Sequence, residues 1–330
     1  MADTAFNVPD RYESLPDAPV AREDLGAGAL RGAGARSPWF WKLLLLSAAL
    51  VWGYSFTTMK DALDAIPVFT LIYLRFLPAA ACMLLLFRKR IMVHLNLRNL
   101  AVGLGMGALM WAAYGLQTLG LDQTTAGKSA FLTGTYCILV PFMSRLISKE
   151  KLTRYNMGAA VLCLGGIALV ALDSVAFNGG DVLTLGGAIF FALQMAVASK
   201  YGRSMDINVI TFWMFVGNGV LSLMTSLALE TQPPLSTWTP SFIGVMVFLS
   251  FGCTCAALLI QNVGLAHVPA STGSLLLSME SPSGVFFSVM LMGEALTPRL
   301  IAGFALIFIS IILSETHFDF LFRRGRSNAR

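Results

Sequence analysis

Long apolar stretches alternate with short polar segments along almost the whole chain after residue 38. Each stretch holds roughly 20 mostly apolar residues, enough at about 1.5 Å of rise per residue to cross a hydrocarbon layer about 30 Å thick. The pattern predicts ten membrane-spanning helices over residues 39–59, 65–87, 99–121, 123–147, 155–172, 182–199, 207–229, 241–266, 268–293 and 300–315. The sequence is therefore typical of an all-α membrane protein.

The composition supports this interpretation, because 56% of the residues are hydrophobic, only 12% are charged, and the mean hydropathy is +0.71. Soluble domains are far more polar. The polar segments between the predicted helices are short, with no glycine-rich phosphate loop, paired-cysteine metal pattern or clustered histidines. We therefore expect no enzyme, no metal site and no cofactor.

The two ends of the chain differ from the rest. Residues 1–38 are rich in Pro, Gly and Ala and have no apolar periodicity, which predicts a disordered tail. They also lack the basic start and apolar core of a secretory signal, so the tail is expected to stay in the cytoplasm. Residues 316–330 form a second, basic tail that we also expect to be cytoplasmic.

Lys and Arg are concentrated on one side of the predicted helices, and such residues favour the cytoplasmic side. Only Lys60, Lys128 and Arg299 fall on the opposite side. Both termini are therefore predicted to be cytoplasmic, and topology accounts for the net charge of +5 without a nucleic-acid partner. The eighteen basic residues on the cytoplasmic side are Arg11, Arg22, Arg31, Arg36, Arg88, Lys89, Arg90, Arg98, Arg145, Lys149, Lys151, Arg154, Lys200, Arg203, Arg323, Arg324, Arg326 and Arg330.

The two halves of the chain resemble each other when one is shifted along the other. Residues 112–169 and 256–313 share fifteen identities in 58 positions without a gap, including Gln117 with Gln261 and Gly120 with Gly264. Because five helices per half is an odd number, the second half must be inverted relative to the first. Inverted repeats of this kind are typical of transporters that expose a midplane site to each side of the membrane in turn.

A loop motif illustrates the inversion. "KEKLT" at 149–153 recurs as "GEALT" at 293–297, where Glu, Leu and Thr are kept and the basic residues are lost. The two copies are expected on opposite membrane faces. We therefore interpret the shared Glu, Leu and Thr as structural residues of the turn, and the basic residues as a feature of the cytoplasmic copy alone. We expect Thr153 and Thr297 to cap the helices that follow them.

The sequence resembles the drug/metabolite transporter superfamily, of the EamA type with ten helices. The resemblance covers residues 39 to 315 and implies an EamA-like five-helix repeat at 39–172, a second and inverted one at 182–315, and a membrane exporter of amino acids or other metabolites. It is carried by "WGYSFTTMK" (52–60), "LRF" (74–76), "GLQTLGLDQTTAGKSAFLTGTYCILVPF" (115–142) and "GLAHVPASTGSLLLSMESPSGVFFSVMLMGEALT" (264–297).

Ionisable groups inside membrane helices usually face a cavity or a partner. Glu280 lies near the middle of the ninth predicted helix, and Tyr136 is its equivalent in the first half. Glu280 either binds a substrate amine or takes up a coupling proton, or else it pairs with Arg75 as a structural contact. Arg75 in turn meets either that carboxyl or a substrate carboxylate. Lys128 either reaches water at the helix end or lines an outer vestibule.

Neutral polar and aromatic side chains complete the candidate site. Gln117 and Gln261 either cross-link helices or line a pocket for a polar metabolite. Tyr114 shares a helix face with Gln117, three positions further along. The aromatic residues that we consider as walls of the pocket are Trp52, Tyr54, Phe56, Trp111, Tyr114 and Trp213.

Together these observations predict a secondary transporter that moves a small organic metabolite, such as an amino acid, outward across the cytoplasmic membrane by alternating access. Efflux of drug-like cations, with Glu280 as the counter-charge, is an alternative within transport. A non-transporting membrane scaffold or enzyme is the alternative from another class. The expected partners are a small-molecule substrate and the lipid bilayer; proton coupling and a homodimer are left open by the sequence.

Overall fold

The computed structural model describes residues 37–149, 154–171, 178–202, 204–268 and 270–316, and all regular elements within these ranges are helical. The predicted tails lie outside them, apart from the few residues next to the first and last helices. In chain order the elements are α2 (Pro38–Leu63), α3 (Val68–Val93), α4 (Leu97–Gln123), α5 (Ala126–Thr133), α6 (Tyr136–Ser148), α7 (Arg154–Ala171), α8 (Gly179–Gly202), α9 (Ile207–Leu229), η1 (Leu235–Thr237), α10 (Pro240–Val247), η2 (Phe248–Ala256), α11 (Ala257–His267), α12 (Ala270–Leu277), α13 (Glu280–Met292) and α14 (Pro298–Thr316).

Each predicted span has a helix, or a helix broken in the middle, as its counterpart. Seven of these helices are long and apolar enough to cross a membrane, counting residues 126–147 and 240–267 as one each. The apolar stretches Met157–Gly166 and Pro298–Leu313 are shorter, and α12 and α13 are separated by a break. The chain is therefore an all-helical, multi-pass membrane protein.

The internal repeat of the sequence recurs in the backbone. α5 and α12 begin at Ala126 and Ala270, which are equivalent positions of the repeat, and each helix is followed by a short break before α6 or α13. The residues that follow α6 and α13, Lys149 and Gly293, are also equivalent, and both adopt left-handed backbone conformations, with φ of 57° and 66°. Glycine adopts this conformation readily. The rest of the first loop motif, residues 150–153, lies outside the described ranges.

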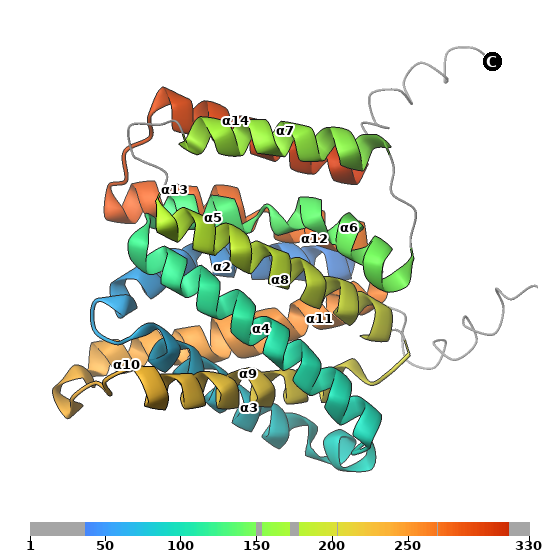
Figure 1. The fold of residues 1–330 in the computed structure, drawn as a ribbon. Coiled ribbons are helices and arrows are strands. Elements are labelled where there is room, and N and C mark those ends of the chain that lie inside the picture. Colours follow the sequence, from blue (N-terminus) through green and yellow to red (C-terminus); the bar gives the residue numbers. More distant parts are fainter. Residues whose placement is uncertain (1–36, 150–153, 172–177, 203, 269, 317–330) are drawn as a thin grey trace, which may run out of the picture. The chain divides into compact units, whose positions relative to one another are not determined.

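Packing between helices relies on close backbone approach. α4 lies against α8 and α9, α3 against α9, α2 against α13, and α7 against α14 (Figure 1). A Cβ atom added at Gly120 would lie only 2.5 Å from the carbonyl oxygen of Gly180 on α8. One added at Gly107 of α4 would lie 2.9 Å from the Cα atom of Gly217 on α9. Small residues permit such approaches, and the resulting van der Waals contacts stabilise helix packing inside a membrane.

Carboxylates from loops hold the beginnings of two helices. Glu230, which follows α9, accepts hydrogen bonds from the backbone N–H groups of Phe69 (2.7 Å) and Thr70 (2.8 Å) at the start of α3. Glu294, which follows α13, accepts one from the N–H of Gly127 (3.0 Å) at the start of α5. Both carboxylates satisfy N–H groups that a helix leaves without an internal partner.

The hydroxyl at the second copy of the loop motif also caps a helix. Thr297 Oγ1 accepts a hydrogen bond from the backbone N–H of Leu300, at 3.2 Å, in the first turn of α14. The expected cap at Thr297 is therefore confirmed. The corresponding expectation for Thr153 lies outside the described residues.

Candidate functional site: a cavity between the two halves of the chain

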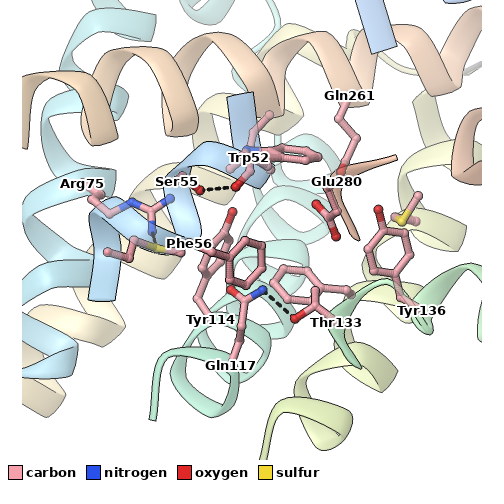
Figure 2. Close-up of a pocket in the computed structure, with 14 residues that line it drawn as sticks. Trp52, Ser55, Phe56, Arg75, Tyr114, Gln117, Thr133, Tyr136, Gln261 and Glu280 are labelled. Carbon is pink, nitrogen blue, oxygen red and sulfur yellow. Dashed lines mark hydrogen bonds between the residues drawn. The ribbon is translucent and has the colours of Figure 1, made fainter. Parts of the chain in front are cut away.

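A cavity lies among helices from both halves of the chain, and the space between its lining atoms, counted together with solvent open to the outside, is about 430 Å³. Most of the lining is apolar or aromatic, with a few polar groups converging on the space, as in many small-molecule sites (Figure 2). The lining residues are Trp52, Ser55, Phe56, Met59, Arg75, Tyr114, Gln117, Thr133, Tyr136, Phe191, Met195, Leu258, Gln261 and Glu280.

The cavity gathers most of the candidates that were chosen from the sequence as polar or aromatic groups within helices. Lys128 is the exception among the eight proposed substrate-binding residues. Phe56, considered as a wall, also lines the cavity, whereas Tyr54, Trp111 and Trp213 are not among the lining residues. The candidates present in the lining are Trp52, Arg75, Tyr114, Gln117, Tyr136, Gln261 and Glu280.

Breaks in two helices place Glu280 and Tyr136 at the cavity. Tyr136 is the first residue of α6 and Glu280 is the first residue of α13, each directly after a break. Glu280 is only 4% exposed, and its carboxyl group and the hydroxyl of Tyr136 are close enough to interact, but neither the Oε1 atom nor that hydroxyl makes a hydrogen bond of good geometry among the described residues. Buried polar atoms without partners are rare in proteins. Their position beside the cavity makes both groups candidates for contact with a ligand.

Arg75 lies on the other side of the same cavity (Figure 2). Its side chain is buried, with Nε donating to Thr254 Oγ1 at 3.1 Å and Nη1 to Met59 Sδ at 2.7 Å. The guanidinium also stands 5.1 Å from the ring centre of Tyr114. The expected structural pair with Glu280 does not form, because no carboxylate among the described residues lies within ion-pair distance of Arg75.

A π-helical segment positions the residues on the Arg75 side. In η2 the helix widens, so that the N–H of Ala257 bonds to the carbonyl of Gly252, five positions earlier. The carbonyl of Cys253, which an α-helix would give to Ala257, accepts a hydrogen bond from Trp52 Nε1 at 2.8 Å. π-helical turns are frequent at functional sites. Here the turn fixes one wall of the cavity.

The two glutamines occupy equivalent positions in the two halves and both reach the cavity. Gln117 Nε2 donates to Thr133 Oγ1 at 3.1 Å, while its buried Oε1 has no partner among the described residues. Gln261 Nε2 donates to Gln194 Oε1 at 3.2 Å and to Asn262 Oδ1 at 3.3 Å. Each side chain therefore has its nitrogen engaged by the protein.

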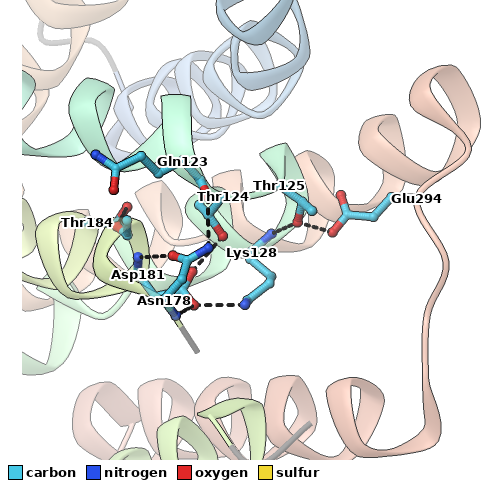
Figure 3. A network of polar contacts seen from close by, with 9 residues as sticks. Gln123, Thr124, Thr125, Lys128, Asn178, Asp181, Thr184 and Glu294 are labelled. Atoms are coloured by element: carbon cyan, nitrogen blue, oxygen red, sulfur yellow. Dashed lines mark hydrogen bonds and ion pairs between the residues drawn. The ribbon is translucent and has the colours of Figure 1, made fainter. Parts of the chain in front are cut away.

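Lys128 belongs to a separate polar network (Figure 3). It neither reaches water nor lines the cavity, because its side chain is 1% exposed and its Nζ lies 2.8 Å from Asp181 Oδ2 at the start of α8. Asp181 also accepts hydrogen bonds from Thr124 Oγ1 (2.6 Å) and from the backbone N–H of Asn178 (3.0 Å). The alternative in which Lys128 reaches water is wrong, because it forms a buried ion pair that joins α5 to α8.

Several lining residues were missed by the sequence analysis: Ser55, Met59, Thr133, Phe191, Met195 and Leu258. The helix ends seen in the structure relate some of them to candidates in the first half. α2 ends at Leu63 and α8 ends at Gly202. When the sequence is aligned so that these two ends coincide, Trp52 pairs with Phe191 and Phe56 pairs with Met195. Leu258 is the equivalent of Tyr114 under the shift that pairs the two glutamines.

A helical membrane bundle with a cavity lined by residues of both halves is an arrangement typical of membrane transporters. The sequence profile of the EamA-like transporter family matches residues 39–172 and again residues 178–316. The chain belongs to this family, whose members are transporters and not enzymes. Within the described residues there is also no group of three or more His, Cys, Asp and Glu side chains that could hold a metal ion.

Relatives of the chain carry the same general description. An uncharacterized transporter of Archaeoglobus fulgidus is 30% identical over 82% of this chain and 83% of its own length. The uncharacterized transporter YoaV of Bacillus subtilis is 25% identical over 83% of this chain and 96% of its own. The probable purine permease 4 of Arabidopsis thaliana is 27% identical over 36% of this chain and 33% of its own.

A solved crystal structure shares the fold. It matches 88% of this chain and the whole of its own with a TM-score of 0.65, at 17% sequence identity.

Proposed function

We propose that this EamA-family transporter carries an amino acid or a related small metabolite that bears both an ammonium and a carboxylate group. The proposed direction is outward across the cytoplasmic membrane, as in the exporters that the sequence resembles. The proposed mechanism is alternating access, in which the two halves exchange conformations around a site near the middle of the membrane.

The proposed topology has ten membrane helices in two inverted five-helix repeats, with both termini in the cytoplasm. The repeats correspond to residues 39–172 and 182–315, flanked by the tails 1–38 and 316–330. The same helix break recurs at equivalent positions of the two halves, in α5–α6 and α12–α13, and this supports the duplication. The concentration of Lys and Arg on one side of the predicted helices supports the orientation.

One observation carries the proposed substrate class. Arg75 and Glu280 are buried on opposite sides of one cavity, and they do not form an ion pair with each other. Uncompensated ionisable groups in a membrane interior are costly, and they usually mark the path of a substrate or ion. A zwitterion offers a carboxylate to the guanidinium and an ammonium to the carboxyl group. Its apolar part would then lie against Trp52, Tyr114 and Phe191.

Two other substrate classes would use fewer of the polar and charged groups of the cavity. A drug-like cation would use the Glu280 side of the cavity but would leave Arg75 without an anion. A purine, suggested by the permease relative, would stack on the aromatic walls but brings no carboxylate to Arg75. The presence of both charged side chains therefore favours the zwitterion.

The test is counterflow in proteoliposomes with three matched compounds: L-leucine, 4-methylpentanoate, which lacks the ammonium, and 3-methylbutylamine, which lacks the carboxylate. We expect saturable counterflow of leucine and little of either analogue. Arg75→Met is expected to abolish leucine counterflow, and Glu294→Gln, a carboxylate outside the cavity, is expected to leave it unchanged. Transport of the amine alone would support the cation alternative, and a folded protein that moves no amino acid, analogue, purine or cationic drug would contradict the proposal.

Glu280 has two distinguishable roles within this function. If its carboxyl binds the substrate ammonium, Glu280→Gln loses counterflow and pH-gradient-driven flux together. If it carries the coupling proton instead, Glu280→Gln keeps counterflow and loses only the driven flux, because counterflow needs no net proton movement. A variant that keeps both activities would exclude Glu280 from either role.

A further inference from the structure

Behind the second glutamine of the cavity lies a closed set of buried polar contacts between α8, α9 and α11. Gln194 and Asn262 have no exposed surface, and Gln261 is 5% exposed. Gln194 Nε2 donates to Asn262 Oδ1 at 3.2 Å and approaches Met214 Sδ at 3.4 Å. Asn262 Nδ2 donates to Thr211 Oγ1 at 3.0 Å and faces the same sulfur at 3.8 Å.

These contacts fix which way each amide points. A thioether sulfur can accept a hydrogen bond but has no proton to donate, so the groups facing Met214 must be the NH₂ groups of Gln194 and Asn262. Their carbonyl oxygens consequently point toward Gln261. Asn262 Oδ1 already accepts from Gln194 Nε2, whereas the oxygen of Gln194 has no other donor in this set of contacts. The NH₂ group of Gln261 donates to both oxygens, at 3.2 Å and 3.3 Å.

The orientation of Gln261 has a consequence at the cavity. Both N–H bonds of the side chain are used by Gln194 and Asn262, so the polar atom left for the cavity is the carbonyl oxygen. Gln117 differs in this respect, because its partner Thr133 has a hydroxyl that can either donate or accept. The structure thus determines the amide orientation of Gln261 and not that of Gln117.

We infer that Gln194 and Asn262 are positioning residues that hold the Gln261 carbonyl oxygen toward the cavity. The part of the cavity near Glu280 then selects ligands that carry N–H donors. This inference rests on the proposed transport function for its effect on selectivity, but its structural part is independent of any substrate. An amide free to rotate would accept from a donor or donate to an acceptor, and so would discriminate poorly. A fixed amide rejects acceptors, because a ligand oxygen would face an oxygen without a proton between them.

The structural part is tested by NMR on protein labelled with ¹⁵N-glutamine in nanodiscs, where the signals absent from Gln261→Glu identify the Gln261 amide. We expect two separated N–H resonances that exchange with water at least tenfold more slowly than those of exposed glutamines. In Asn262→Leu this protection should fall. Asn218→Leu is the matched control, because Asn218 is an equally buried amide on α9 that bonds to Ser222 and does not line the cavity.

The selectivity part is tested by counterflow. For L-leucine, Asn262→Leu and Gln194→Leu should raise KM about tenfold with little change in maximal rate, whereas Asn218→Leu should change neither. Gln194→Glu should raise KM much less than Gln194→Leu, since a neutral carboxyl group keeps an oxygen that can accept a hydrogen bond from Gln261.

The two parts fail separately. Rapid exchange of the Gln261 amide in the wild-type protein would overturn the inference whether or not leucine is carried. A protected amide together with an unchanged KM in both leucine variants would also overturn it and would leave the transport proposal intact. Absence of any counterflow with a protected amide would refute the proposed substrate instead, and with it the selectivity assigned to Gln261.

Discussion

The ion pair between Lys128 and Asp181 is expected to be one of the most sensitive points of the fold. Its two atoms lie 2.8 Å apart, and the two side chains are 1% and 0% exposed. Removing one partner of a buried pair costs about 3–5 kcal/mol, because the other charge stays buried without compensation. Lys128→Met leaves the Asp181 carboxylate with the hydrogen bonds from Thr124 and Asn178. We therefore expect a loss of about 3 kcal/mol, at the lower end of that range.

The double variant separates the pair from the loss of packing. In Lys128→Met/Asp181→Asn no charge is left buried, and the new amide still offers an oxygen to Thr124. Replacement of a buried pair by neutral groups is often nearly neutral, so the double variant should be more stable than Lys128→Met alone by about 2 kcal/mol. The free energies are measured by reversible unfolding with SDS in mixed micelles, followed by circular dichroism.

Two results would refute this reasoning. One is a cost below about 1 kcal/mol for Lys128→Met, which is the range of exposed ion pairs. The other is additivity, in which the double variant loses as much as the two single variants together. Either result would mean that water reaches the ion pair and that the Lys128 ammonium is hydrated at the helix end.

The other predictions concern single contacts and can be measured as melting temperatures in the same detergent. Glu294→Ala should lower the free energy of unfolding by about 0.5–2 kcal/mol because the N–H of Gly127 loses its acceptor, whereas Glu294→Gln should lose less; equal losses would exclude a capping role. Glu230→Ala should lower the free energy of unfolding by a similar amount, because N–H groups at the start of α3 lose their acceptor, and an unchanged melting temperature would contradict this. Gly120→Ala should cost about 1–3 kcal/mol by forcing α4 away from Gly180, so a neutral result would mean that the helices separate easily.

The positions of the helices could be predicted from the sequence because lipid leaves few alternatives. A backbone inside hydrocarbon must satisfy its own hydrogen bonds, so an apolar stretch of the right length becomes a helix. The same argument identified Arg75, Glu280 and the two glutamines, since a polar side chain inside such a stretch must face a cavity or a partner. Here local sequence and tertiary environment are tightly linked.

Pairing between distant side chains could not be predicted in this way. Lys128 was expected at water or in an outer vestibule because it lies near a predicted helix end, but its partner Asp181 comes from α8, far along the chain. Phe191 and Met195 were missed for another reason: an apolar residue in an apolar helix carries no sign of facing a cavity. The π-helical turn of η2 was also hidden, because its sequence, "FLSFGCTCA", has no feature that separates it from an α-helix.

The repeat also explains how one cavity can combine symmetric and asymmetric features. Under the proposed inverted topology the two halves must adopt each other's conformation, and this favours equivalent backbone breaks and equivalent neutral side chains such as Gln117 and Gln261. A zwitterion, however, has two different ends, so its recognition requires that equivalent positions carry different side chains. Tyr136 stands opposite Glu280 in the repeat, and the shift that places α2 on α8 and α3 on α9 puts Met214 at the position of Arg75. Each half therefore contributes one charged group that its counterpart lacks, which under the proposed function would let a zwitterionic substrate keep one orientation while the helices around it change places.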